Sequence, residues 1–323
     1  MRKKVALIYG GNSSEAEVSV KSGKNIASHL DSSKYEVYEI MVTGRDWSVR
    51  NVGDLPVQID KSDFSFFMPG GGRVVFDIAL IMIHGTPGED GMLQGYFDMI
   101  GLKYTTCPSI VSAITFNKYA CKCFLRDSGV AMAKEVFLRR GDKIDIDAIS
   151  DKLGYPLFVK PNDGGSSFGV TKVNSREGLL NAIEAAFRED DRVLIEEFIS
   201  GREMTNGALL KGDELIVLPV TEIIPHNEFF DYEAKYLGAS REVCPAEIPD
   251  SLSESIKECT ARIYRHMGCK GVVRVDYIVN DNGIFFLEIN TVPGMTEMSL
   301  VPQQVKAFGL SMGEFLDTLL DIN

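Results

Sequence analysis

Apolar and polar residues along the first third of the chain follow a strand–helix–strand rhythm. The predicted strands are Val5–Tyr9, Tyr35–Val42 and Phe76–Ile83. The first and last are nearly continuous apolar runs, which is typical of parallel strands buried on both faces. Ser14-x-x-Glu17 has a capping-box pattern for a helix after the first strand, and Met92–Ile100 predicts another short helix. This alternation favours a doubly wound parallel sheet.

The rest of the chain predicts mixed α+β structure. The expected strands are Leu157–Lys160, Val193–Ile199, Ala208–Leu210 and Leu215–Val220. The expected helices are Ser112–Ser128, Glu177–Phe187 with Leu180 on its apolar face, one from Ser251-x-x-Glu254 to about Met267, and a terminal one from Ser311-x-x-Glu314. Residues 226–247 have no sustained periodicity, and so long a loop in a compact domain is often a lid.

A predicted C-terminal hairpin carries the most informative polar pattern. Asn280-Asp281-Asn282-Gly283 is a strong turn signal between two strands. Arg274 and Asp276 are two residues apart on the first strand, and Glu288 and Asn290 are two apart on the second. Because strand side chains alternate between faces, a tight turn can bring all four onto one face.

Aspartate, glutamate and asparagine oxygens are ligands that Mg²⁺ prefers, with nucleotide phosphates and water completing the octahedron. We therefore predict a metal site on this hairpin. Buried carboxylates need a counter-ion, which magnesium and Arg274 would provide. The alternative interpretation is a solvated polar face that alternates by chance.

A glycine-rich loop, Pro161–Gly169, follows the strand that ends in Lys160. Its glycines allow a close backbone approach, and the Ser166 and Ser167 hydroxyls could bind phosphate. It lacks the Gly-Lys-Ser/Thr ending of a Walker A motif. A simple hairpin turn is the alternative.

Two residues at the ends of buried strands predict a further binding edge. Glu15 falls in the first turn of the helix after Gly10-Gly11, and His84 follows the strand Phe76–Ile83. Ligands often bind outside the carboxyl ends of such strands. Helix-dipole complementation by Glu15 and a structural role for His84 are the alternatives.

Charge and composition narrow the class of protein. The 323 residues carry a formal net charge of −12, which disfavours nucleic acid or an anionic membrane as a main partner. No run approaches the about 18 apolar residues of a membrane span. The six cysteines contain no Cys-x-x-Cys pair, as expected of free thiols in a reducing compartment. We expect a soluble cytoplasmic protein.

Six motifs, in order along nearly the whole chain, resemble those of the D-alanine–D-alanine ligase family of ATP-grasp enzymes. They are GGNSSEAEVS (10–19), HGTPGEDG (84–91), GSSFGV (165–170), DYEAKY (231–236), GVVRVD (271–276) and LEINTVPGMTEMSL (287–300). The resemblance implies ATP-dependent ligation of two D-alanines to D-alanyl-D-alanine through an acyl phosphate, for peptidoglycan synthesis. It also implies an ATP-grasp architecture with an N-terminal domain (1–104), a central domain (105–203) and a C-terminal domain (204–323).

The resemblance assigns roles to individual residues. ATP would be bound by Lys118, Lys160, Ser167, Glu196, Phe198, Glu203 and Lys235. Two Mg²⁺ ions, with Mn²⁺ as a substitute, would be held by Asp276, Glu288 and Asn290. Catalysis would involve Glu15, Ser166, Tyr236, Arg274 and Gly294, and the substrates would also contact His84, Ser299 and Leu300. The expected partners are ATP and D-alanine, and a homodimer is compatible with the resemblance.

Parts of the sequence are also compatible with other functions. A D-Ala–D-lactate or D-Ala–D-Ser ligase is the nearest alternative, although DYEAKY resembles the dipeptide-forming enzymes. A nicotinamide-dependent dehydrogenase would fit the strand–Gly-Gly–helix start, but no Gly-x-Gly-x-x-Gly occurs there. An inactive nucleotide-binding module would be expected to lack a metal ligand, whereas all three are present.

Overall fold

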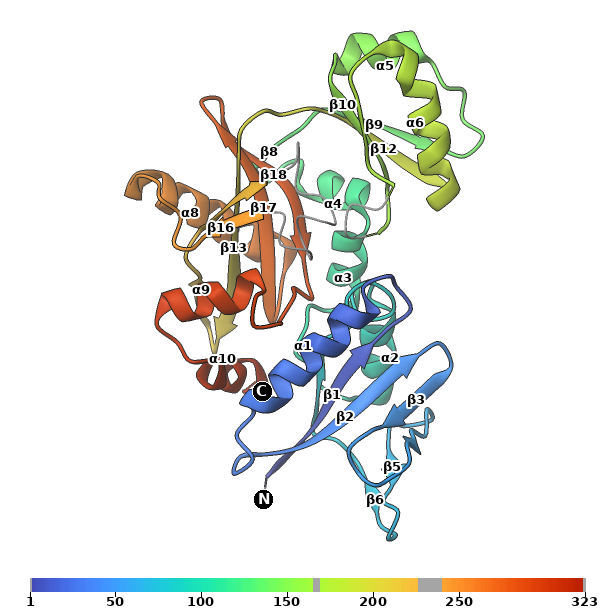
Figure 1. Ribbon diagram of the computed structural model, residues 1–323, viewed down its shortest axis with the longest axis vertical. Coiled ribbons are helices and arrows are strands. Elements are labelled where there is room, and N and C mark those ends of the chain that lie inside the picture. The colour runs from blue at the N-terminus through green and yellow to red at the C-terminus, as the bar shows by residue number, and fades with distance from the viewer. Residues whose placement is uncertain (1, 165–168, 226–239, 322–323) are drawn as a thin grey trace.

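A mixed sheet, parallel at β2-β1-β7 and antiparallel at its β4-β3 edge, forms the N-terminal part of the computed structural model (Figure 1). The structure describes residues 2–164, 169–225 and 240–321. Its elements are β1 (Lys3–Gly10), α1 (Ala16–His29), β2 (Tyr35–Thr43), β3 (Asp46–Val49), β4 (Val57–Gln58), β7 (Ile78–Ile81) and α2 (Met92–Ile100). The strand order is β4-β3-β2-β1-β7, with β1 parallel to both β2 and β7. The predicted parallel sheet is confirmed. A small ribbon of β5 (Phe66–Phe67) and β6 (Arg73–Val74) lies beside it.

The middle of the chain forms a separate antiparallel sheet, at the upper right of Figure 1. Its strands are β9 (Glu135–Arg139), β10 (Leu157–Pro161), β11 (Thr171–Val173) and β12 (Arg192–Glu197), in the order β11-β10-β12-β9. Helices α5 (Ile146–Leu153) and α6 (Arg176–Glu189) share a hydrophobic core with one face of this sheet. The opposite face carries the alternate residues of each strand.

The C-terminal sheet is the largest in the described part of the chain. Its strands are β8 (Ala131–Met132), β13 (Arg202–Lys211), β14 (Glu214–Val217), β15 (Thr221–Pro225), β16 (Ser240–Val243), β17 (Val272–Asn280) and β18 (Gly283–Asn290). Helices α3 (Ser109–Phe116), α4 (Lys118–Leu125) and α8 (Asp250–Met267) pack in its core. Helices α9 (Leu300–Phe308) and α10 (Met312–Leu320) end the chain.

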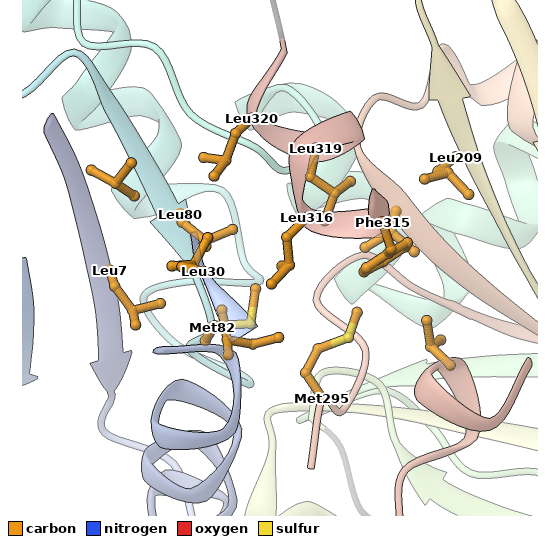
Figure 2. Close-up of a cluster of buried hydrophobic side chains, with 14 of the residues drawn as sticks. Leu7, Leu30, Leu80, Met82, Leu209, Met295, Phe315, Leu316, Leu319 and Leu320 are labelled. Carbon is orange, nitrogen blue, oxygen red and sulfur yellow. The ribbon is translucent and has the colours of Figure 1, made fainter. Parts of the chain in front are cut away.

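One hydrophobic core joins the two ends of the chain. Buried residues of β1 and β7 pack with residues of β13, α9 and α10 in a single cluster. Figure 2 shows side chains of α10, among them Leu316 and Leu320, gathered with Leu80 and Met82. Because interiors are close-packed, this shared core fixes the N-terminal sheet against the C-terminal sheet.

The structure corrects several local predictions. The single helix expected over Ser112–Ser128 is two helices, because Asn117 is extended and its side chain caps α4 by accepting from the Ala120 N–H. Leu180 is 44% exposed, whereas Leu179 and Ile183 fill the core under α6.

Two predicted capping boxes are also wrong. Helix α1 begins after Glu15, one residue beyond the predicted cap Ser14, and Glu15 makes no side-chain capping hydrogen bond. Helix α8 begins after Pro249, which has no side chain that can cap it. The third box, Ser311 with Glu314, is confirmed. The segment expected to be loop through residue 247 contains β16, and its residues 226–239 lie outside the described part.

Candidate functional site

The predicted hairpin places its four polar residues on one face. Asp276 on β17 is paired directly with Glu288 on β18, and Arg274 is paired with Asn290. A bulge at Leu287 separates these pairs from the turn, since Tyr277 is paired with Phe286 but Asp276 with Glu288. Without this extra residue Asp276 would pair with Leu287, so the bulge brings Glu288 and Asn290 to the face of Arg274 and Asp276. Directly opposed residues project to the same side of a sheet, so the sequence prediction of a shared face is confirmed.

Asp276 is the most constrained member of this group. Its carboxylate accepts two hydrogen bonds from Arg274, at 2.9 and 2.8 Å, one of 2.5 Å from the Thr205 hydroxyl and one of 3.1 Å from the Asn290 amide. The residue is only 4% exposed. Arg274 therefore supplies the counter-charge that lets Asp276 and Glu288 face each other.

The donor set of the hairpin fits magnesium better than a softer metal. Two carboxylates and an amide are oxygen ligands, and Mg²⁺ usually takes only one or two protein carboxylates, keeping water and phosphate oxygens for the rest. Within the described residues there is no group of three His, Cys, Asp or Glu that could hold a metal by itself.

A cavity of about 560 Å³ opens in front of this hairpin. Its lining combines α1 and the turn before it, the loop after β7, the junction of α3 and α4, the hairpin, and the loop before α9. The predicted site residues among its lining are Glu15, His84, Lys118, Arg274, Glu288, Asn290, Gly294, Ser299 and Leu300. Residues far apart in the sequence, at positions 15 and 300, therefore share one cavity.

His84 links the N-terminal sheet to the C-terminal loop. One ring nitrogen, Nδ1, lies 2.7 Å from the Val292 carbonyl oxygen, and Nε2 lies 3.3 Å from the Ser22 hydroxyl. Burial lowers the pKa of His84, with Glu15 acting in the opposite direction. The ring is therefore neutral at physiological pH, and it orients the loop that carries Gly294.

Glu89 is a cavity residue that the sequence analysis did not single out. Its carboxylate accepts hydrogen bonds from the N–H groups of Gly85, at 3.0 Å, and Val292, at 3.4 Å. Burial, reinforced by the nearby Glu15, raises the pKa of Glu89 to about 7. Its place in the motif HGTPGEDG was the available signal.

A second group of predicted residues lies on the central sheet. Glu196 on β12 forms ion pairs with Lys160 and with Lys122, whose Nζ is 2.5 Å from Glu196 Oε1. Burial alone would raise the pKa of Glu196, but the two ammonium groups outweigh it and lower that pKa to about 2. Lys122 was not predicted, although it follows Lys118 by four residues and so shares its helix face.

Aromatic residues lie beside Glu196 on this sheet. The ring centroids of Phe158 and Phe198 are 5.8 Å apart, and Lys172 Nζ lies 4.7 Å from the Phe198 ring. Phe158 is paired directly with Glu196 across β10 and β12.

Glu203, another predicted ATP-binding residue, lies on the C-terminal sheet. It is paired with Ile278 across β13 and β17, on the face of the sheet that carries Asp276.

Some predicted residues lie outside the described part of the chain. They are Ser166, Ser167, Lys235 and Tyr236. At the edge of the glycine-rich loop, Lys118 Nζ donates a hydrogen bond of 2.5 Å to the Gly164 carbonyl. This contact places the start of that loop beside the cavity.

Comparison with known proteins gives matches along almost the full length. The family model of the D-ala D-ala ligase N-terminus matches residues 4–107, and the family model of the D-ala D-ala ligase C-terminus matches residues 124–321. The D-alanine–D-alanine ligase of Phocaeicola vulgatus is 44% identical over 322 residues, 99% of each chain. That of Porphyromonas gingivalis strain W83 is 48% identical over 318 residues, 98% of this chain and 96% of the relative. The chain belongs to the D-alanine–D-alanine ligase family.

Solved structures of this ligase family share its fold. The VanG D-Ala:D-Ser ligase from Enterococcus faecalis superimposes with a TM-score of 0.89 at 34% identity, covering 99% of both chains. The D-alanine–D-alanine ligase from Bacillus anthracis complexed with ATP gives 0.79 at 30% identity, covering 99% of this chain and 96% of that one. The predicted ATP-grasp architecture is thereby confirmed. In the described part of this family member, no helix is long and apolar enough to span a lipid bilayer.

Proposed function

We propose that this protein joins two D-alanine molecules to D-alanyl-D-alanine, with conversion of ATP to ADP and phosphate, as a step in peptidoglycan precursor synthesis. The observation that carries the proposal is the meeting of Glu288 and Arg274 with Glu15 and the N-terminus of α9 in one cavity. In this proposal the oxygen ligands for a metal-bound triphosphate and the positions of the two amino acids are adjacent.

The first step is phosphoryl transfer. A carboxylate oxygen of the first D-alanine attacks the γ-phosphorus, the bond to the bridging oxygen breaks, and ADP leaves. Lys118 and Lys160 balance the phosphate charge, and Glu15 pairs with the ammonium group of this D-alanine. Asp276, Glu288 and Asn290 would hold Mg²⁺, or Mn²⁺ in its place, which supplies positive charge to the phosphate oxygens when bound.

The second step forms the peptide bond. The amine of the second D-alanine attacks the acyl carbon, and phosphate leaves with the former carboxylate oxygen. Arg274 and the Gly294 amide stabilise the tetrahedral oxyanion. The carboxylate of the second substrate binds at Ser299 and Leu300, where the N-terminus of α9 favours an anion.

The remaining predicted roles complete this proposal. Ser166 and Tyr236 link to Glu15, while Ser167 and Lys235 bind phosphates; all four lie outside the described residues. Water exclusion by segment 226–247 would protect the acyl phosphate from hydrolysis. We further propose three domains, 1–104, 105–203 and 204–323, and a cytoplasmic reaction, where ATP is available. A homodimer remains a prediction.

The identity of the second substrate defines the competing function. The likeness to a D-Ala:D-Ser ligase favours D-serine as the alternative to a second D-alanine. The test is phosphate release from ATP with D-alanine alone, then with D-serine or D-lactate added, followed by mass spectrometry of the product. We expect D-alanyl-D-alanine and full turnover with D-alanine alone. Turnover only after addition of D-serine or D-lactate would assign the alternative, and no turnover would refute ligation.

A further inference from the structure

Two carboxylates face each other on the face of the central sheet that α5 and α6 do not cover. Glu135 on β9 is paired directly with Glu196 on β12. Like charges directly opposite each other destabilise a sheet, and more so where water is excluded. A cation between them removes this repulsion.

Lys122 is that cation. Its ammonium nitrogen lies 2.5 Å from Glu196 Oε1 and 3.2 Å from Glu135 Oε2, and it donates a 2.8 Å hydrogen bond to the Ala133 carbonyl. Three acceptors match the three N–H donors of an ammonium group. The residue is only 3% exposed, so Lys122 is a fixed part of the interior.

Lys160 binds the other oxygen of the same carboxylate. Its ammonium pairs with Glu196 Oε2, and its side chain is 14% exposed, more than that of Lys122 at 4%. It extends from β10, two residues after Phe158, on the face of the sheet that carries Glu196. Glu196 thus pairs with two lysines. Lys122 is enclosed in the interior, whereas Lys160 is the lysine that the proposed function assigns to the ATP phosphates.

We propose that Lys122 is a positioning residue for the nucleotide base. It holds Glu196 ionised and oriented, and the triphosphate draws Lys160 away from Glu196 Oε2. That oxygen then accepts a hydrogen bond from the exocyclic amine of adenine. The inference rests on the proposed function, in which ATP is the bound nucleotide and Glu196 is one of the residues that bind it.

Lys122 and Lys160 are expected to have opposite effects on adenosine binding. A purine with a carbonyl at the 6-position, as in inosine triphosphate, presents an acceptor to the carboxylate and is repelled. Adenosine lacks the phosphates that would draw Lys160 away, so it must compete with Lys160 for Glu196. Removing Lys160 should therefore strengthen adenosine binding and weaken ATP binding, whereas removing Lys122 should weaken the binding of both.

The experiment is direct titration of Lys122→Met and Lys160→Met with ATP, inosine triphosphate and adenosine, without D-alanine. The control is Lys134→Met, which loses a neighbouring but exposed lysine–glutamate pair. For Lys122→Met we expect ATP binding to weaken about tenfold, the loss of one hydrogen bond to a charged group. The preference for ATP over inosine triphosphate should fall by a similar factor. For Lys160→Met we expect tighter adenosine binding and weaker ATP binding.

A second variant separates positioning from folding. Lys122→Met removes the cation between Glu135 and Glu196, although Arg126 and Lys160 still pair with them. The double variant Lys122→Met/Glu135→Gln removes the repulsion and should fold. We expect this double variant to keep the reduced preference for ATP over inosine triphosphate. A preference equal to that of Lys134→Met would overturn the role of Lys122, and weaker adenosine binding by Lys160→Met would overturn the exchange at Glu196. Because no turnover is measured, failure to ligate D-alanine would refute the proposed function without deciding this inference.

Discussion

Asp276→Asn is expected to lower kcat/KM for ATP by on the order of 10³-fold, because charge neutralisation at the phosphates contributes several kcal/mol to phosphoryl transfer. The substitution removes one of two opposed carboxylates and leaves the hydrogen bonds from Thr205 and Asn290 sterically feasible. The measurement is ADP release as a function of Mg²⁺ concentration. The variant should need more Mg²⁺ for half-maximal rate.

The matched control is Asp317→Asn on α10. Asp317 is likewise a hydrogen-bonded carboxylate, which accepts from Lys34 and Tyr35, but it lies on α10, away from the hairpin that carries Glu288 and Asn290. Its rate and Mg²⁺ dependence should equal those of the parent protein. Parental Mg²⁺ dependence in Asp276→Asn, with the fold intact by circular dichroism, would remove Asp276 from the metal site.

Arg274→Met is expected to lower kcat by about 10²–10³-fold, the usual effect of losing one donor to a developing oxyanion. It should also destabilise the fold by about 1–3 kcal/mol, because Asp276 loses two hydrogen bonds and its buried counter-charge. Turnover measurements and thermal unfolding separate the two effects. Arg274→Lys keeps the charge but not the two-pronged geometry, so its kcat should fall between those of Arg274→Met and the parent.

Arg202→Met provides the control for Arg274. Arg202 makes a comparable two-pronged contact with Glu222, at 2.6 Å for both bonds, in the same sheet but away from the cavity. It should reduce stability without reducing kcat. Equal kcat values for Arg202→Met and Arg274→Met would mean that Arg274 acts only through folding.

The hairpin could be predicted because local rules determine it. Alternation with period two sets the face of each side chain, and the Asn-Asp-Asn-Gly turn aligns the two strands. These features predict the hairpin and the pairs that share a face within each strand, but the register of Asp276 with Glu288 also needs the bulge at Leu287, for which the sequence gives no signal. The parallel sheet was predictable for a similar reason, since both faces of Val5–Tyr9 are apolar.

Other parts of the site depend on contacts between distant segments. Lys122 and Glu135 look like surface charges in the sequence, and only the pairing of β9 with β12 brings them together around Glu196. Glu89 gains its raised pKa from burial between loops some 200 residues apart. The break at Asn117 likewise reflects tertiary structure, because Asn117 forms a bridge with Asp163 and its side chain bonds to it.

Phosphorylation of the D-alanine carboxylate before the peptide bond forms is tested most directly by transfer of an oxygen isotope. D-Alanine labelled with ¹⁸O at both carboxylate oxygens is incubated with ATP and the protein in unlabelled water, and the released phosphate is analysed by mass spectrometry. Activation as an acyl phosphate predicts one ¹⁸O atom in each phosphate released with the dipeptide. Phosphate without ¹⁸O, formed together with the dipeptide, would contradict the account.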